Sequence, residues 1–185
     1  MGGDRIVVHT GSCGKISREQ ALELAKDTMR LALKALDERN LGHVHICPET
    51  MGKINQLGTL YEVMELCKLD VRLIPCIDFG HLNARTIGGV SDEQSFGAVI
   101  DRIKDGLGYE RASRMHVHFS RIEYSAKGEV RHLTFDNNEF GPDPGLIAIM
   151  YDKLMYPTVI CESAGTQAKD ALMLKQIYNE RAKLI

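Results

Sequence analysis

Short apolar runs alternate with amphipathic stretches along the chain, and this alternation predicts five strand–helix units. Strands are expected where apolar residues run together without helical spacing, at 6–8, 43–48, 71–77, 114–119 and 157–161. Helices are expected where apolar residues recur three or four positions apart, at about 18–40, 60–66, 92–105, 144–150 and 166–182. Capping boxes at Ser17–Gln20 and Ser91–Gln94 mark the starts of the first and third helices.

Strict alternation of strands and helices implies βαβ crossovers and therefore a parallel sheet in the α/β class. The run 71–77 is apolar almost throughout, which indicates a sheet that is covered on both faces or closed into a barrel. A complete (β/α)8 barrel uses about 250 residues, or about 31 per unit. The 185 residues therefore predict a partial TIM-type barrel of five units, with residues 1–185 forming one incomplete domain.

Composition limits the kinds of binding partner and the cellular compartment that we expect for this chain. Lys plus Arg is 23 and Asp plus Glu is 25, so no overall basic excess points to a polyanion. No apolar run reaches the roughly 18–20 residues of a membrane span, and the first residues do not have the pattern of a signal peptide. The five cysteines are odd in number and form no CxxC pair, which predicts reduced thiols and a cytoplasmic location.

Each expected strand ends in a residue that can bind a metal. In parallel α/β folds, ligands bind at the carboxyl ends of the strands, so these side chains converge if the sheet closes. Imidazole together with carboxylate suits Zn²⁺, Mn²⁺ or Fe²⁺, although any one of these residues alone is more simply a structural hydrogen-bonding group. The residues are His9, Glu49, Asp78 with His81, His116 or His118, and Glu162, and His132 in an expected loop adds a further imidazole.

Two local patterns allow more than one interpretation. Asp78 and His81 lie three residues apart at a strand end and can address two neighbouring metals, but they also fit an Asx-type turn with His81 in solvent. His116 and His118 share one face of a strand because side chains alternate along it. One of the two is expected to bind a metal while the other contacts substrate or packs.

At these positions the sequence resembles the endonuclease IV family within the xylose isomerase-like barrels. The resemblance extends from about residue 6 to residue 178. The segment 76–81 is similar to the family's Cys-Ile-Asp-Thr-Cys-His, and 116–121 is similar to His-Leu-Asn-Asp-Ser-Lys. Further matches are His9-Thr-Gly-Ser12 with His-Pro-Gly-Ser, Glu49 and the later Leu57-Gly58 with Glu-Asn-Thr and Leu-Gly, and Cys161-Glu162-Ser163 with Leu-Glu-Thr.

The resemblance implies a trinuclear zinc cluster that hydrolyses the phosphodiester 5′ to an abasic site in DNA. It implies one to three divalent ions, most simply Zn²⁺ with Mn²⁺ as an alternative, and a pocket that takes the extruded abasic nucleotide. Glu49 and Glu162 are expected to be catalytic, and His118, Arg121 and Arg131 to contact substrate. The implied ligands are His9, Glu49, Asp78, His81, His116, His132 and Glu162, and further basic residues that could rim the mouth are Lys15, Lys53, Arg85 and Lys127.

Three departures from the family pattern matter. Val130 stands in place of the Asp of the family's Asp-Arg-His motif, and the adjacent Glu129 is expected to point in a different direction, which leaves the third metal site incomplete. His118 and Phe119 replace the family's Asn and Asp. The family's early strands, with a further histidine ligand and a DNA-contacting loop, have no counterpart in this sequence.

Two alternatives to a phosphodiesterase remain open at this point. Glu49, Asp78, His116 and Glu162 match the single-metal set of two Glu, one Asp and one His in sugar isomerases and epimerases of related barrels. An incomplete barrel is also compatible with a non-catalytic module. Because five unclosed parallel strands leave exposed edges, we expect a homo-oligomer or a complementing N-terminal segment, and no membrane partner.

Overall fold

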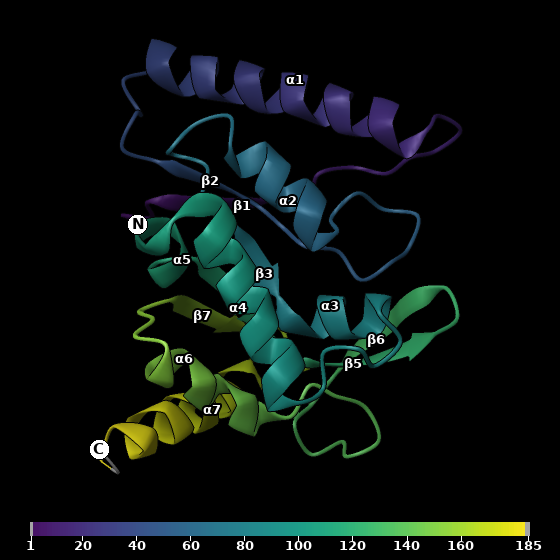
Figure 1. Ribbon diagram of the computed structural model, residues 1–185, viewed down its shortest axis with the longest axis vertical. Coiled ribbons are helices and arrows are strands. Elements are labelled where there is room, and N and C mark those ends of the chain that lie inside the picture. The colour runs from purple at the N-terminus through teal and green to yellow at the C-terminus, as the bar shows by residue number, and fades with distance from the viewer. Residues whose placement is uncertain (1, 184–185) are drawn as a thin grey trace.

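The computed structural model describes residues 2–183, and its centre is a row of five parallel strands (Figure 1). Direct pairing joins β1 to β2 and joins β3 to β4 and β7. Parallel bridges from Ile46 to Leu73 and from Glu49 to Cys76 connect the two groups, which gives the order β1-β2-β3-β4-β7. The strands are β1 (Arg5–Val8), β2 (His45–Pro48), β3 (Cys76–Asp78), β4 (His116–Phe119) and β7 (Thr158–Cys161). This arrangement is that of a partial TIM barrel.

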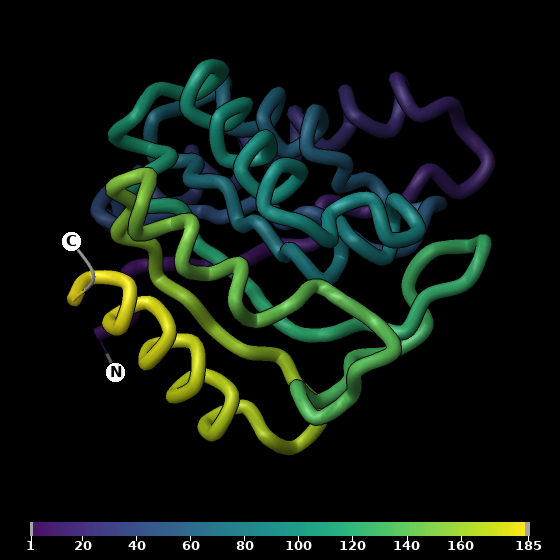
Figure 2. The backbone as a smooth tube through the Cα atoms, turned by 60° about the horizontal axis from the view of Figure 1, so that its bottom comes forward, coloured from purple at the N-terminus to yellow at the C-terminus, as the bar shows by residue number. Residues whose placement is uncertain are grey.

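The predicted helices follow the strands in chain order, from α1 at the top of Figure 1 to α7 at the bottom, and Figure 2 shows the same progression from another side. Ser17 caps the first helix in a complete capping box with Gln20, as its sequence predicts. Two short helices were not predicted, α3 (Phe79–Arg85) and α5 (Tyr109–Ser113). The others are α1 (Arg18–Glu38), α2 (Leu60–Cys67), α4 (Glu93–Leu107), the 3-10 turn η1 (Pro144–Ile147) with α6 (Ala148–Asp152), and α7 (Gln167–Ala182).

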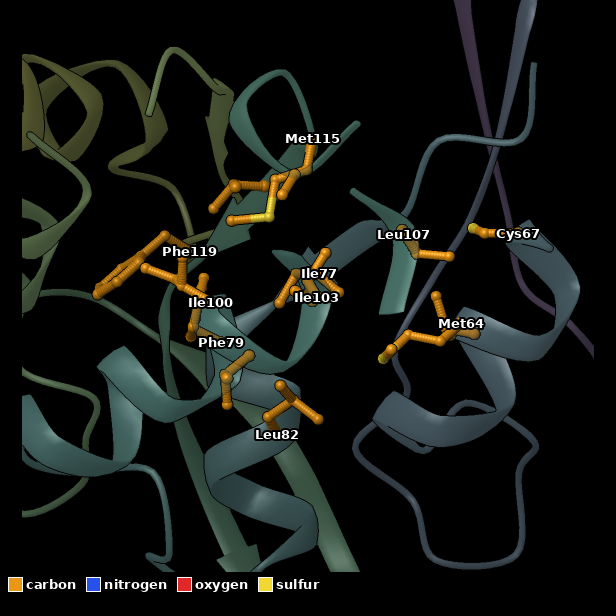
Figure 3. Close-up of a cluster of buried hydrophobic side chains, with 14 of the residues drawn as sticks. Met64, Cys67, Ile77, Phe79, Leu82, Ile100, Ile103, Leu107, Met115 and Phe119 are labelled. Carbon is orange, nitrogen blue, oxygen red and sulfur yellow. The ribbon is translucent and has the colours of Figure 1, made fainter. Parts of the chain in front are cut away.

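The hydrophobic core lies between the strands and these helices (Figure 3). Phe79 stacks on Phe96 with ring centroids 3.9 Å apart, and Phe119 from β4 lies beside both rings. Side chains alternate along a strand, so when Val117 and Phe119 face the core, His116 and His118 must face the other side. The polar residues of the strands therefore share an inner face that the helices do not cover.

Two local predictions need correction. The third strand was expected over 71–77, but ladder pairing is limited to Cys76–Asp78 and a single bridge at Leu73. Pro75 lies between them and has no N–H to donate, which explains the interruption. The second capping box lies one residue later than predicted, because Asp92 rather than Ser91 accepts from the backbone N–H three residues on, at Ser95.

An antiparallel hairpin, β5 (Arg121–Ser125) with β6 (Gly128–Leu133), interrupts the expected strict alternation. His132 is therefore a strand residue, and its expected place in a loop was wrong. Glu123 pairs with Arg131 and Tyr124 pairs with Glu129, so Val130 is an extra residue in a β-bulge. Because one extra residue reverses the alternation of side chains, Glu129 comes to the same side of the hairpin as His132.

Two glycines let this hairpin dock on the loop that follows β2. Glu129 donates its N–H to the carbonyl of Gly52 at 3.1 Å, and Ile54 donates to Lys127 at 3.3 Å. A Cβ at Gly52 would lie 2.6 Å from the Cβ of Glu129, and one at Gly128 would lie 2.2 Å from the Gly52 carbonyl oxygen. Only residues without side chains allow this approach, which brings Glu129 over β3 and α3.

Arg85 holds the same loop from below. Its guanidinium donates to the carbonyls of Met51, Lys53, Ile54 and Gln56, at 2.7 to 3.0 Å. Among the described residues its hydrogen bonds are all to backbone oxygens, so Arg85 stabilises the loop.

Two further expectations concern the cysteines and the helices. All five cysteines are free thiols, as their number and spacing predicted. Among residues 2–183, no helix combines the length and the apolar character needed to cross a membrane.

Alanine substitutions at Gly52 and Gly97 are expected to have opposite effects, because only Gly52 makes the close approach to the hairpin. Gly52→Ala forces a Cβ against Glu129, and we expect it to lower the free energy of unfolding by about 1–3 kcal/mol. Gly97→Ala in α4 meets only the flexible end of Lys153, at 3.3 Å, and we expect a gain of about 0.5–1 kcal/mol from helix propensity. Urea unfolding of both variants measures the difference, and a neutral Gly52→Ala would contradict the close approach.

Candidate metal centre

Four ligand residues meet at the carboxyl ends of β2, β3, β4 and β7. Glu49, Asp78, His118 and Glu162 offer atoms that all lie within 4.8 Å of one another. Three of them are residues that the sequence analysis named as ligands. The structure brings His118 to this group, whereas the sequence interpretation assigned His118 to substrate and His116 to the metal.

Two of the three carboxylates of this group, Glu49 and Asp78, are buried, and their contacts leave an unmatched negative charge. Burial raises the pKa of Glu49, but hydrogen bonds with His118 and His81 and the charges of these rings outweigh it and lower the pKa to about 2. Asp78 is fully buried; its Oδ1 accepts the His81 N–H at 2.7 Å, while its Oδ2 has no hydrogen-bond partner among the described residues. A buried carboxylate oxygen without a donor is costly, and a cation at this position satisfies it.

A second ligand group, His81, Glu129 and His132, lies beside the first. Nδ1 of His81 is 2.9 Å from the Thr50 carbonyl oxygen, and Nδ1 of His132 is 2.8 Å from Oγ of Ser120. The Nε2 atoms of the two rings lie 3.5 and 3.9 Å from the Glu129 carboxylate. Imidazoles held by one nitrogen while the other remains open are typical of metal ligands, so these residues fit a divalent ion.

The positions of the Glu129 and His81 side chains each differ from one expectation of the sequence analysis. Glu129 was expected to point in a different direction from the family's Asp, but the bulge at Val130 turns its carboxylate toward His81 and His132. His81 was allowed a solvated position in an Asx-type turn. Asp78 does accept from the His81 backbone as the cap of α3, but the ring of His81 is buried.

The two groups form one continuous acidic site. Nδ1 of His81 lies 3.5 Å from Glu49 and 3.4 Å from Asp78, and Nε2 of His132 lies 4.0 Å from Glu162. Burial lowers the pKa of His81, but Asp78, Glu49 and Glu129 outweigh it and raise the pKa to about 10. The same negative field that retains a proton on this ring attracts divalent cations in its place.

His9 and His116 are members of neither of these two groups, although each lies beside one of their residues. His9 is at the rim, with 64% of its side chain exposed and Nε2 3.2 Å from a Glu49 oxygen. His116 is buried one layer below, next to Cys76 and His118. Burial, the neighbouring His118 and the charge of Arg5 lower the pKa of His116 to about 4.

The two arginines expected at the substrate are engaged elsewhere. Arg121 is buried and donates to the Phe140 carbonyl at 2.8 Å, and Arg131 is an exposed partner of Glu123 at 2.7 Å. Within residues 2–183, neither guanidinium has a hydrogen bond or ion pair with the two ligand groups. Arg121 instead anchors the segment that follows the hairpin, and Arg131 stabilises the hairpin itself.

Comparison with known proteins agrees with this architecture. Residues 1–176 match the family model described as xylose isomerase-like TIM barrel. The chain is 37% identical over 178 residues to the uncharacterized protein MJ0133 of Methanocaldococcus jannaschii, and the match covers 96% of this chain and 64% of that relative. The chain thus spans less than two thirds of the relative's length. Its fold, its strand-end ligands and this match together show that the chain belongs to the xylose isomerase-like TIM barrel family.

Proposed function

We propose that the site is a multinuclear divalent-metal centre of a phosphodiesterase that cleaves DNA at abasic sites. The observation that carries the proposal is the second ligand group, His81, Glu129 and His132, directly beside Glu49, Asp78, His118 and Glu162. Two adjacent groups suit two or more ions. A phosphodiester needs charge compensation on both its attacking and its leaving oxygens, and neighbouring metal ions provide it.

Glu49 and Glu162 in the first group differ in burial, and we assign them different roles on that basis. Glu49 is buried, and its Oε1 lies 2.8 Å from His118 and 3.5 Å from His81, so this carboxylate connects the two ligand groups. The Glu162 side chain is 37% exposed and therefore faces the incoming substrate. Divalent ions held by these residues would supply a nucleophile from water near neutral pH and would stabilise phosphate charge. Glu162 is the carboxylate placed to orient that water.

Two lysines beside the segment of Glu129 support a nucleic-acid substrate despite the net charge of −2. Lys53 and Lys127 are exposed where the hairpin meets the loop after β2, next to Glu129. Lys15 is exposed in the loop after β1, and none of the three has an ion-pair partner within the described part of the chain. Cations around an acidic metal pocket bind phosphates on either side of the cleaved bond.

A single-metal sugar isomerase or epimerase is the second candidate. It is supported by the first ligand group taken alone, because Glu49, Asp78, His118 and Glu162 form a set of two Glu, one Asp and one His. In that case His81, Glu129 and His132 would hold no ion. The number of bound ions therefore separates the two candidates before any substrate is tested.

The first prediction concerns the reaction. We expect the chain loaded with Zn²⁺ or Mn²⁺ to cleave a duplex that contains one abasic site, with the nick on the 5′ side of that site. We expect a chelator to abolish this activity. Glu49→Gln removes a direct ligand, so we expect its rate to fall more than the roughly 10–100-fold typical of losing an outer partner. If the metal-loaded chain leaves the abasic duplex intact and interconverts a keto-sugar with one ion bound, the isomerase is correct.

A further prediction concerns Glu129. We expect Glu129→Gln to lower the metal content by one ion per chain, because His81 and His132 then lack a carboxylate partner. Glu123→Gln is the matched control, since this residue lies on the same hairpin but pairs with Arg131 on its exposed side. Elemental analysis after dialysis measures both. An unchanged metal content in Glu129→Gln would exclude the second ligand group.

A further inference from the structure

A different set of donors lies on the inner face below the carboxylates. Cys76 on β3 is directly opposite His116 on β4 in the parallel register, and His118 follows two residues later on the same face. A sulfur or nitrogen atom from each of these residues lies within 4.8 Å of the other two. His116 and His118 meet edge to face, with ring centroids 5.1 Å apart.

The ring nitrogens of His116 lack hydrogen-bond partners within the described part of the chain, which indicates that these three residues share a further ligand. The residue is 4% exposed, and neither of its ring nitrogens has a hydrogen-bond partner among the described residues. Cys76 is fully buried beside it, yet thiol and imidazole form no hydrogen bond, so a simple thiol–imidazole pair does not account for the contact. Buried imidazole nitrogens are normally satisfied, and two without partners in one ring require an explanation.

The surroundings make water a poor explanation. Cys76 packs with Cys47, Ile74 and Val7 in a small apolar cluster on the inner face. A water molecule needs two to four polar partners, and the cluster itself offers only its sulfurs. The charge of Arg5 also acts on His116, and the buried Nη1 of Arg5 has no hydrogen-bond partner among the described residues. A thiolate and imidazoles are instead the donors that Zn²⁺ prefers, at about 2.3 Å for sulfur and about 2.0–2.1 Å for nitrogen.

We propose that Cys76, His116 and His118 bind a Zn²⁺ ion in a site separate from the carboxylate centre above it. Nδ1 of His118 lies 2.8 Å from Glu49, so its Nε2 is the nitrogen assigned to this ion. The positive charge that remains after one thiolate binds is balanced by the buried Glu49 carboxylate through the His118 ring. Three protein donors leave one coordination position for a small ligand such as water.

The site is linked to the proposed phosphodiesterase centre through His118, whose Nδ1 lies 2.8 Å from Glu49. With Nε2 assigned to the zinc of this site, Nδ1 keeps its proton and donates to the Glu49 carboxylate. The existence of the site does not depend on the reaction above it, because Cys76 and His116 belong to neither upper group. Among the three donors, Cys76 distinguishes the site, since no residue of the two upper groups contributes sulfur. Sulfur ligation is therefore the property to measure.

The experiment uses the full chain, stripped with a chelator and refilled with Co²⁺ in place of Zn²⁺. We expect a thiolate-to-Co²⁺ charge-transfer absorption, and we expect Cys76→Ser to lose it. In His116→Gln we expect the apparent metal affinity of the site to fall at least about tenfold. Cys47→Ser is the matched control, because Cys47 belongs to the same apolar cluster but not to the three donors. A band that survives in Cys76→Ser overturns the proposal.

A second measurement needs no variant and covers the case in which Cys76→Ser does not fold. X-ray absorption at the zinc edge of the unaltered, zinc-loaded chain is expected to show a sulfur neighbour at about 2.3 Å, corresponding to one sulfur per chain averaged over all bound zinc ions. Zinc bound only by nitrogen and oxygen would overturn the proposal. Glu129→Gln separates the two proposals, since it is expected to impair the upper centre and DNA nicking while the cobalt–thiolate band remains.

Discussion

The burial of Glu49 and Asp78 at the strand ends is the constraint on which the rest of the site depends. Both carboxylates are almost inaccessible to water, and one oxygen of Asp78 has no donor. Buried charge must be paired or bound to metal. His81 and His118 converge on these carboxylates, and their raised pKa values follow from the same field. The geometry of the mouth thus follows from concentrated negative charge, which fits a site for divalent ions.

Much of the fold could be predicted from the sequence because its signals are local. Apolar runs and helical spacing located the parallel strands and the long helices, and the alternation rule put strand-end residues at one mouth. The hairpin was missed because its strands carry mixed polar residues such as Glu123 and Arg131 and no strong turn signal. The short helix after Asp78 was missed because seven residues give too little periodicity.

The site was predictable as a set of residue types but not in its pairing. Glu129 becomes a neighbour of His81 only through the bulge at Val130 and the contact of Gly52 with Gly128, and both depend on tertiary structure. His116 and His118 are equivalent in the alternation pattern, so sequence alone could not tell which lies beside Glu49. The available signal for the second ligand group was that Glu129 follows Gly128 and lies three residues before His132.

The two edge strands of the sheet bear on the prediction of a homo-oligomer or a complementing segment. β1 and β7 each pair with one strand, and Ile160 on the inner face of β7 is 45% exposed, whereas Cys76 and His118 on the central strands are buried. In a closed barrel the inner face is filled by side chains from every strand. Exposure that rises from the centre of the sheet to β7 marks the side on which further strands would continue this packing. The expected homo-oligomer or complementing segment remains a prediction, and this inner face is where either would have to supply apolar side chains.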